Sequence, residues 1–267
     1  METLNTDPRK YKIYSGPDIP NLYSRIWESN KRYVAEAKFI ENIWHKCDFS
    51  VKGKILDLGC GTGVHIELLK ELGFTVFGLD VNTHQLRSAK ELYHNLNSVL
   101  CNANMIKIPF QSSCFDLVTY MSESINYLDK EDVRKSLKET YRCLRPGGAI
   151  IIVAKWAKNL GGRGFEESYK NGIRYSKHWI TRTDVPEMNP DEAIWNAEFE
   201  DLKTGHKQKE SHYFPFMNPF AIAEIATELG FINTEVLDIH SIYETKIPLL
   251  KESSERTAII IASVNKI

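Results

Sequence analysis

From Lys54 to Ala154 the chain alternates short apolar runs with segments of helical periodicity, and this alternation constrains the fold more than any other feature. Helical patterns over 64–72, 82–93 and 130–144 separate most of the apolar runs, which are KILDL (54–58), TVFGLD (75–80), SVLC (98–101), FDLVTYM (115–121) and AIIIVA (149–154). Continuous apolar strands joined by helices are typical of a parallel sheet that is covered on both faces. Right-handed crossovers bring the carboxyl ends of such strands to one edge, where ligands bind.

Polar and glycine residues predict where several elements begin and end. Asn82, Asp129 and Asn218 each precede a helical pattern and can cap its first turn. Gly73 ends the first helix of the alternating region, and Pro146-Gly147-Gly148 breaks the chain before the strand at 149–154. Periodicity also predicts a helix over 23–47 and another over 219–230, and the two last strands are FINTEVLDI and RTAIIIASV.

Residues 159–213 interrupt the alternation. GIRYSKHWITRT and EAIWNAEFEDL alternate polar with apolar or aromatic residues at period two, and Thr204-Gly205-His206 is typical of a turn. We therefore predict an α/β fold with a Rossmann-like, seven-stranded, mostly parallel sheet, helices on both faces and an inserted antiparallel lid. The expected parts are an N-terminal helical cap segment (1–50), a core (51–158 and 214–267) and the lid (159–213).

Composition excludes several classes of protein. The 267 residues include 34 Lys and Arg against 35 Asp and Glu, and residues 159–213 hold 8 Lys and Arg against 10 Asp and Glu. Neither the chain nor the lid is therefore basic enough to predict nucleic-acid binding. No apolar stretch approaches the roughly 18–20 residues that span a bilayer. METLNTDPRKYK has no apolar segment after its charges, so no secretory signal is expected. The five cysteines are odd in number and widely spaced, which predicts a reduced, cytoplasmic protein without disulfides or a metal site.

The strongest local signal is the turn from Asp57 to Gly63, DLGCGTG, directly between a strand and a helix. Glycines let the backbone turn sharply and approach a ligand, and the N–H groups of the helix start face that ligand. A dinucleotide loop would place its third glycine at position 64, where this chain has Val64. A carboxylate at Asp57 suits a cationic amine better than a phosphate. Asp80, about 20 residues past the first glycine, can take the hydroxyls of a ribose; a turn without ligand and a capping role for Asp80 remain open.

These residues resemble a known family. KILDLGCGTG, GLD, NMIKIPF, FDLVTYM and LRPGGAIIIV look like the successive motifs of the S-adenosylmethionine-dependent methyltransferases with a Rossmann-like sheet. The resemblance covers about residues 54–154, with the closing elements at 218–264. It implies S-adenosylmethionine as cofactor and S-adenosylhomocysteine as product. It places glycines around the methionine part of the cofactor, Asp57 near the ammonium, Asp80 at the ribose and Asn104 at the adenine amine. The cofactor-binding residues that it implies are Tyr14, Tyr33, Asp57, Gly59, Gly61, Gly63, Asp80, Val81, Asn104, Met105 and Met121.

A narrower resemblance concerns the acceptor. The N-terminal tyrosines, the turn MSESINY (121–127) and the lid are similar to features of the N,N-dimethyltransferases of nucleotide-linked aminosugars and, more distantly, of glycine and sarcosine N-methyltransferases. Where the aminosugar enzymes have a His that helps to deprotonate the amine, this chain has Tyr127. The resemblance also aligns Arg256 with an Arg near the substrate.

An amine nucleophile must arrive neutral, so a nearby carboxylate, His or water chain helps to take its proton. The catalytic candidates are Tyr127, Glu123 and His178, and the substrate candidates are Tyr23, Trp156, His178 and Arg256. Rings of Tyr14 and Tyr33 can attract a sulfonium. For each of these residues a packed or solvated side chain without a functional role is the competing interpretation.

We therefore expect direct in-line methyl transfer to a small molecule, with an amine nitrogen as the preferred acceptor. Methylation at oxygen or of RNA, and a cofactor-binding regulatory subunit, stay open as alternatives, and an oxidoreductase is disfavoured by Val64. MSESINY lacks the Asn/Asp-Pro-Pro-aromatic tetrapeptide of DNA amine methyltransferases, and no cysteine is placed as the nucleophile of a cytosine-5 enzyme. The expected partner is a small-molecule acceptor, without nucleic acid or membrane, and a homodimer is an option.

Overall fold

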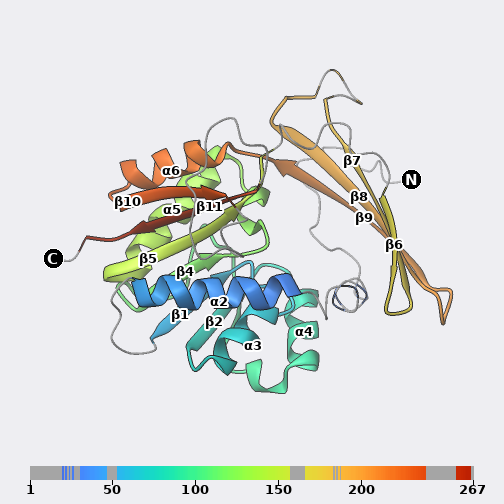
Figure 1. Ribbon diagram of the computed structural model, residues 1–267, viewed down its shortest axis with the longest axis horizontal. Helices are drawn as coiled ribbons and strands as arrows, with labels where there is room; N and C mark the ends of the chain where they lie inside the picture. Colours follow the sequence, from blue (N-terminus) through green and yellow to red (C-terminus); the bar gives the residue numbers. More distant parts are fainter. Residues whose placement is uncertain are drawn as a thin grey trace, which may run out of the picture.

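The computed structural model describes residues 31–46, 53–156, 166–182, 188–238 and 257–265, together with positions 20, 22, 24, 26, 184 and 186. Figure 1 shows the helices and strands, with η for a 3₁₀ turn. In chain order they are α2 (Lys31–Lys46), β1 (Lys54–Leu58), α3 (Val64–Glu71), β2 (Thr75–Asp80), α4 (Thr83–Leu92), η2 (His94–Leu96), β3 (Leu100–Asn102), β4 (Phe115–Tyr120), η3 (Ser124–Tyr127), α5 (Lys130–Cys143), β5 (Leu144–Ala154), β6 (Glu166–Lys170), β7 (Ile173–Ile180), β8 (Glu192–Asp201), β9 (Lys207–Pro215), α6 (Pro219–Glu228), β10 (Ile232–Asp238) and β11 (Ala258–Ser263).

Seven strands form the central sheet in the order β10-β11-β5-β4-β1-β2-β3. The strands from β1 to β5 pair in parallel, whereas β11 runs antiparallel to both β5 and β10. This confirms the predicted Rossmann-like, mostly parallel sheet. The chain leaves β3 at one edge and continues in β4 on the other side of β1, so the strand order switches between β1 and β4. Ligands of such sheets bind at the carboxyl ends of the strands at this switch.

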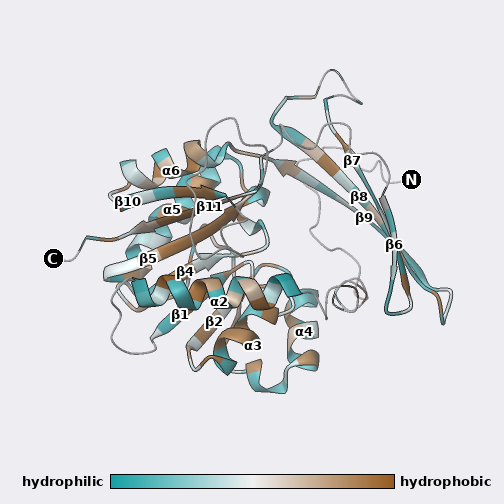
Figure 2. Cartoon of the chain, viewed as in Figure 1, coloured by the Kyte–Doolittle hydropathy of each residue, from teal (hydrophilic) through white to brown (hydrophobic). Residues whose placement is uncertain are grey.

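Helices cover both faces of the central sheet (Figure 1). On one face α5 and α6 contribute Val133, Leu137 and Ile225 to a buried cluster, and on the other face α2 and α3 contribute Phe39 and Ile66 to a second cluster. From Ala149 to Ala154, successive residues of β5 belong alternately to the two clusters, which explains why this part of the strand is a continuous apolar run (Figure 2).

The predicted caps begin three helices. Asn82 accepts hydrogen bonds from the backbone N–H groups of His84 and Gln85 at the start of α4. Asp129 accepts from the N–H of Asp132 at the start of α5, and Asn218 caps α6 in the same way. Each side-chain oxygen satisfies a backbone donor that has no partner inside the helix, so these helices begin where the sequence predicted.

Several boundaries differ from the sequence prediction; for example, helix α2 covers Lys31–Lys46, whereas the periodicity predicted a helix over 23–47. The third strand lies at Leu100–Asn102 rather than at 98–101. The segment Pro146-Gly147-Gly148 does not break the chain, because β5 already begins at Leu144 and continues through it with a shift of register. Backbone hydrogen bonds from Gly147 N–H to Val264 O and from Val264 N–H to Gly148 O, 3.1 and 2.8 Å long, satisfy this bulge. Pairing with a neighbouring strand therefore overrides the local turn signal.

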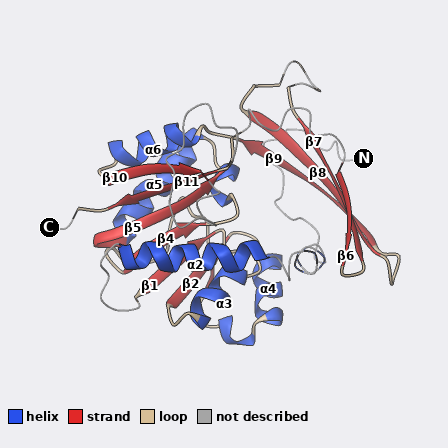
Figure 3. Cartoon of the chain, in the orientation of Figure 1, coloured by secondary structure: helices blue, strands red, loops and turns tan. Residues whose placement is uncertain are grey.

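The inserted lid is a separate antiparallel sheet in the order β6-β7-β8-β9 (Figure 3). Buried and partly exposed residues alternate along β8 and β9, so the lid has one buried face. This inner face carries an aromatic cluster against which the N-terminal Leu22 and Ile26 pack, and whose lid members include Tyr175, Trp179, Trp195, Phe199, Phe214 and Phe216. The antiparallel lid predicted from period-two patterning is confirmed.

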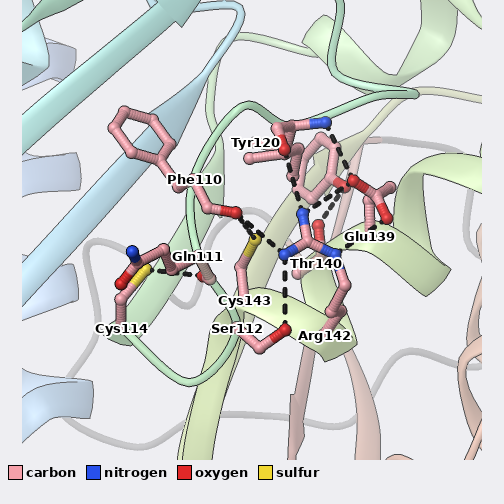
Figure 4. Close-up of polar contacts among 10 residues, drawn as sticks. Phe110, Gln111, Ser112, Cys114, Tyr120, Glu139, Thr140, Arg142 and Cys143 are labelled. Atoms are coloured by element: carbon pink, nitrogen blue, oxygen red, sulfur yellow. Dashed lines mark hydrogen bonds and ion pairs between the residues drawn. The ribbon is translucent and has the colours of Figure 1, made fainter.

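Helix α5 also fixes the backbone that precedes β4 (Figure 4). Arg142 donates to the carbonyl oxygens of Ile108 and Phe110 at 2.9 and 2.8 Å, and Glu139 accepts from the N–H of Ile108 at 3.0 Å. The Arg142 and Glu139 side chains are paired with each other at 2.8 Å. These contacts hold the segment that follows Asn104. Among the described helices, none is both long and apolar enough to cross a bilayer.

Candidate active site

A cavity of about 410 Å³ lies at the carboxyl ends of β1, β2 and β4, at the switch in strand order. Its walls come from α2, the turn after β1, the end of β2, the segment after β3 and the turn after β4. Pockets of roughly 300–1,000 Å³ are of the size that binds small ligands. The cavity therefore lies where the sheet topology predicts a ligand.

Glycines are required in the turn after β1. Gly59 has a left-handed φ of 73°, and a Cβ there would lie 2.6 Å from Cβ of Ser124. Gly61 has a φ of 54°, and its N–H donates to Oδ2 of Asp80 at 2.9 Å. The N–H of Gly59 donates to Leu79 O at 2.8 Å, which ties the turn to the neighbouring strand. A side chain at either glycine would strain the backbone, and at Gly59 it would also clash.

Asp57 is a buried carboxyl group, and only one of its two oxygens accepts a hydrogen bond from the described residues. Its Oδ1 accepts a 2.8 Å hydrogen bond from Oγ1 of Thr119, whereas Oδ2 has no hydrogen-bond partner among the described residues. Burial raises the pKa of Asp57 to about 6, while the charge of His65 and the Thr119 hydrogen bond lower it and the charge of Asp80 raises it further. An acceptor oxygen that is buried without a donor costs free energy, so Oδ2 is a place for a cationic ligand group.

Asp80 connects the turn to the start of α4. Besides the hydrogen bond from the N–H of Gly61, Asp80 accepts a 2.8 Å hydrogen bond from the N–H of Asn82 through its Oδ1. Burial raises the pKa of Asp80, and the hydrogen bonds from the backbone of Asn82 and Gly61 lower it. A carboxylate has about four acceptor positions, so Asp80 can still accept from a ligand hydroxyl.

A largely buried ionic network that the sequence analysis did not predict lies at the cavity wall. Arg32 pairs with Glu36 at 2.6 Å and with Glu123 at 3.1 Å, and Glu36 lies 2.7 Å from Nε2 of His65. Burial alone would raise the pKa of Glu36 and lower that of His65. Their mutual hydrogen bond reverses both shifts, so the pKa of Glu36 falls and that of His65 rises. Arg32 and Glu36 are four residues apart on α2, but their pairing with His65 joins two segments distant in sequence.

The turn after β4 is held in an uncommon backbone conformation. Ser122 and Glu123 have left-handed φ values of 48° and 60°. For residues other than glycine such values persist only where the surroundings enforce them, and they cluster at functional sites. Burial would raise the pKa of Glu123, but the charges of Lys155 and Arg32 lower it overall. Glu123 is thus an ionised partner of Arg32, which makes it a weak proton acceptor.

Asn104, Met105 and Val81 also line the cavity. Oδ1 of Asn104 accepts from the N–H of Ile106 at 3.1 Å. An amide oxygen has two lone pairs, so it can also accept from a ligand amine. Val81 is 55% exposed, which leaves an apolar surface for a flat ring.

The cavity brings together most of the residues that the sequence singled out. The predicted residues that line it are Tyr33, Asp57, Gly59, Gly61, Asp80, Val81, Asn104, Met105, Met121, Glu123 and Tyr127. Lining residues that the sequence analysis did not select include Arg32, His65 and Gln85.

Other predicted residues lie elsewhere. Gly63 has a left-handed φ of 80° at the start of α3, where a Cβ would meet Leu96, so its role there is in the turn. Trp156 is buried just after β5, and His178 lies on the face of the lid sheet opposite Trp179 and the aromatic cluster. Neither lines the cavity. Tyr14, Tyr23 and Arg256 fall outside the described residues, and the roles of all these residues stay predictions.

The cavity fits the cofactor that the sequence resemblance implies. Oδ2 of Asp57 is a buried acceptor that matches an ammonium group, and a Cβ at Gly61 would meet Oε1 of Gln85 at 3.6 Å, so the backbone there lies close to the cavity space. Asp80 retains acceptor capacity for a ribose, and Val81 and Met105 offer apolar contact. The donor and acceptor set therefore matches a nucleoside that carries a cationic amino-acid end.

Comparison with known proteins agrees with this geometry. Residues 55–148 match the family described as "Methyltransferase domain". The putative methyltransferase YqeM of Bacillus subtilis is 34% identical over 111 residues, which are 41% of this chain and 45% of that protein. The ubiquinone/menaquinone biosynthesis C-methyltransferase UbiE of Pseudoalteromonas translucida is 30% identical over 127 residues, 43% of this chain and 49% of that protein. The chain thus matches about half the length of these curated relatives.

Solved structures are similar over nearly the whole chain. An S-adenosylmethionine-dependent methyltransferase from Clostridium acetobutylicum has a TM-score of 0.74 at 19% identity, over 93% of this chain and 98% of that one. CalS10, an amino pentose methyltransferase from Micromonospora echinaspora solved with S-adenosylmethionine bound, has a TM-score of 0.66 at 16% identity, over 95% and 98%. Residues 55–148 are thus similar to a methyltransferase domain, and the chain shares the fold of solved S-adenosylmethionine-dependent methyltransferases.

Proposed function

We propose that this protein transfers a methyl group from S-adenosylmethionine to a small-molecule acceptor, and that the acceptor atom is an amine nitrogen. The observation that carries the proposal is one cavity that two groups of residues line. The first group is Asp57 with its unpaired Oδ2, the glycine turn and Asp80, and the second is the turn after β4, which contributes Tyr127.

The residues of the chain have distinct tasks in this reaction. When bound, S-adenosylmethionine supplies a sulfonium methyl group that a lone pair can take without a covalent enzyme intermediate. Asp57 binds the ammonium, and Asp80 accepts from the ribose hydroxyls. Tyr33 and Tyr127 line the space beside them. The protein then has to hold the acceptor atom in line at about 3–3.5 Å from the methyl carbon and to exclude water.

Charge supports an amine as the acceptor. Four carboxyl groups line the cavity, from Asp57, Asp80, Glu123 and Asp132, against the guanidinium of Arg32 and the imidazole of His65. A cavity with this balance attracts cations such as a sulfonium and an ammonium, and it repels the phosphates of a nucleic acid. A protein of this fold that methylates an amino pentose supports the same acceptor class.

Carbon or oxygen acceptors form the second candidate class. The relative UbiE is a C-methyltransferase of ubiquinone and menaquinone biosynthesis, and it is 30% identical over the matched segment. Aromatic hydroxyl compounds therefore belong in the acceptor screen beside amines.

Calorimetry followed by an acceptor screen tests the proposal. We expect S-adenosylmethionine to bind with one site per chain, and NADH not to bind. A mass-spectrometric screen over small amines, phenols and quinols should then detect a product that carries one added CH₂. A protein that does not bind S-adenosylmethionine contradicts the proposal. Binding without any methylated product over all three panels favours a cofactor-binding regulatory subunit instead.

A further inference from the structure

Behind Tyr127 lie two buried polar side chains that the sequence analysis did not select, His212 and Glu210. Both are on β9, two residues apart on the inner face of the lid, and they are 1% and 5% exposed. Oη of Tyr127 lies 2.9 Å from Nδ1 of His212, and Nε2 of His212 lies 3.4 Å from Oε2 of Glu210. A phenol, an imidazole and a carboxyl thus stand in a row that begins at the cavity wall and ends inside the lid.

We propose that this row is a proton relay for the acceptor, an inference that rests on the proposed methyl transfer. The proton that the acceptor loses moves to Oη of Tyr127 while the hydroxyl proton of Tyr127 moves to Nδ1 of His212. The acceptor atom keeps the electron pair of the broken bond to hydrogen and uses it to bind the methyl carbon. The resulting imidazolium is stabilised by the Glu210 carboxylate.

The arrangement selects the tautomer that such a relay needs. A carboxylate only accepts hydrogen bonds, so the proton of a neutral His212 ring is favoured on Nε2, which faces Glu210. Nδ1 then presents its lone pair to Tyr127, whose hydroxyl donates to it. Tyrosine alone is a poor base near pH 7, with an unperturbed pKa of about 10, whereas imidazole titrates near 6.5. His212 therefore supplies the basicity that Tyr127 lacks.

The relay is positioned from both the core and the lid. On the core side, Oγ of Ser124 donates to Leu58 O at 2.8 Å, and the amide of Asn126 bonds to both the carbonyl and the N–H of Lys155. These contacts fix η3, which carries Tyr127. On the lid side, the ring of Trp195 lies 4.7 Å from His212 in an edge-to-face contact.

Within the described part of the chain, the charged or titratable groups placed near His212 are Glu210 on β9, Tyr127 on η3 and Lys177 of β7, whose register places it across Ala197 from Glu210. Lys155 lies beyond, over the ring of Trp179 at 5.4 Å. The carboxyl group of Glu210 lies against Nε2 of His212, so its removal tests the relay directly.

Nuclear magnetic resonance of the ligand-free protein labelled with ¹⁵N-histidine tests the relay without any substrate. The His212 signals are assigned by their loss in His212→Asn. We expect the neutral ring to carry its proton on Nε2, and Glu210→Gln to change the ¹⁵N signals of the His212 ring. Glu198→Gln makes the same chemical change on the outer face of the lid and should leave the His212 signals unchanged. A proton on Nδ1 at neutral pH, or an equal shift in both variants, would overturn the relay.

Kinetics with an identified acceptor separate proton transfer from mere positioning. Asn at position 212 can accept from the Tyr127 hydroxyl but cannot take its proton. We expect His212→Asn to lower kcat about 100-fold, to leave the affinity for S-adenosylmethionine and the KM of the acceptor within about twofold, and to flatten the acidic limb of the pH profile. A variant with wild-type kcat would show that His212 only orients Tyr127, and the relay would be wrong. Tyr127→Phe should reproduce the loss of kcat.

The two proposals fail in distinguishable ways. A wild-type protein that binds no S-adenosylmethionine contradicts the proposed function, whereas the tautomer of His212 is read in the absence of cofactor. A protein that binds cofactor and methylates an acceptor, but keeps full kcat in His212→Asn and Glu210→Gln, retains its function and loses the relay.

Discussion

After their proposed roles, we call the part of the cavity around Asp57 and Asp80 the cofactor end and the part around Tyr127 the acceptor end, and the two are built in different ways. At the cofactor end, Asp57 and Asp80 stand at or near the carboxyl ends of β1 and β2, and Asp80 bonds to the backbone N–H groups of Gly61 and Asn82. At the acceptor end, Tyr127 meets His212 across 85 positions of sequence, and the contact joins the core to the lid. The first end depends on strand order and glycines, and the second on how two sheets pack. Substitutions should therefore separate the stability of the lid from the affinity of the cofactor end.

The largest effect is expected in the lid. Phe199 is fully buried in the aromatic cluster of the inner face. Phe199→Ala should lower the free energy of unfolding by about 3–5 kcal/mol, because a large buried ring leaves a cavity. Chemical denaturation measures this, and calorimetry on the folded protein should find the affinity for S-adenosylmethionine within about twofold of wild type. Leu202→Ala, at a position that is 51% exposed, is the control. A large loss of cofactor affinity in Phe199→Ala would break the separation of the two ends.

The next effect concerns the glycine turn. At Gly61 a Cβ would meet only Oε1 of Gln85, at 3.6 Å, so the fold can accept a side chain that then enters the cavity. Gly61→Arg should weaken cofactor binding about 100-fold, or ~2.7 kcal/mol, as measured by calorimetry. Gly205→Arg carries a similar backbone cost, at a φ of 72° in a lid turn with open space around it. Equal cofactor affinity in the two variants would contradict the placement of the cofactor.

A smaller loss is expected from Asp80. Asp80→Ala removes a ribose acceptor and the partner of the N–H groups of Gly61 and Asn82. Cofactor affinity should fall about 30-fold, or ~2 kcal/mol, while the circular dichroism spectrum stays that of a folded protein. Asp129→Ala removes a capping carboxylate at another helix and should cost about 1 kcal/mol of stability without changing cofactor affinity. Wild-type cofactor affinity in Asp80→Ala would argue against the ribose contact.

The smallest effect is a pH dependence set by Asp57. Its pKa of about 6 lies above the unfolded value, so this group takes up protons on folding, and its contribution to stability decreases as the pH rises from about 4 to 6. A bound ammonium favours the ionised carboxyl, so cofactor affinity should instead increase about tenfold from pH 5 to pH 7. Calorimetry across this range measures the slope, and Asp57→Asn should remove it. A slope that persists in Asp57→Asn would assign the titration to another group, such as His65.

Local patterns predicted much of the fold because they reflect local physics. The caps at Asn82 and Asp129 begin the expected helices, since a side-chain oxygen two or three residues before a free N–H needs no tertiary contact. The break expected at Pro146-Gly147-Gly148 failed, since β11 supplies the backbone partners of this bulge from a distant part of the chain. Period-two patterning predicted the lid, but it could not indicate which face of the lid turns toward the core.

The same limit applies to the site. His178 and His212 both lie in strands of the lid, and the sequence analysis selected His178 as a proton acceptor within the predicted lid. The packed structure puts His212 against Tyr127 and leaves His178 on the other face. A side chain's face follows from strand register and sheet orientation, and both depend on long-range packing.

The sequence by itself determined the parallel sheet, the glycine turn and the two acidic positions at the cofactor end. The glycine turn and the two acidic positions depend on backbone conformation and on a chain segment shorter than 30 residues, and the sheet follows from a strand–helix pattern that repeats along the chain. Only the tertiary structure decided that Arg32, Glu36 and His65 form one buried network, and that Tyr127 stands against an imidazole. Such contacts join side chains from separate elements, and their free energy becomes available only after the surrounding core has excluded water.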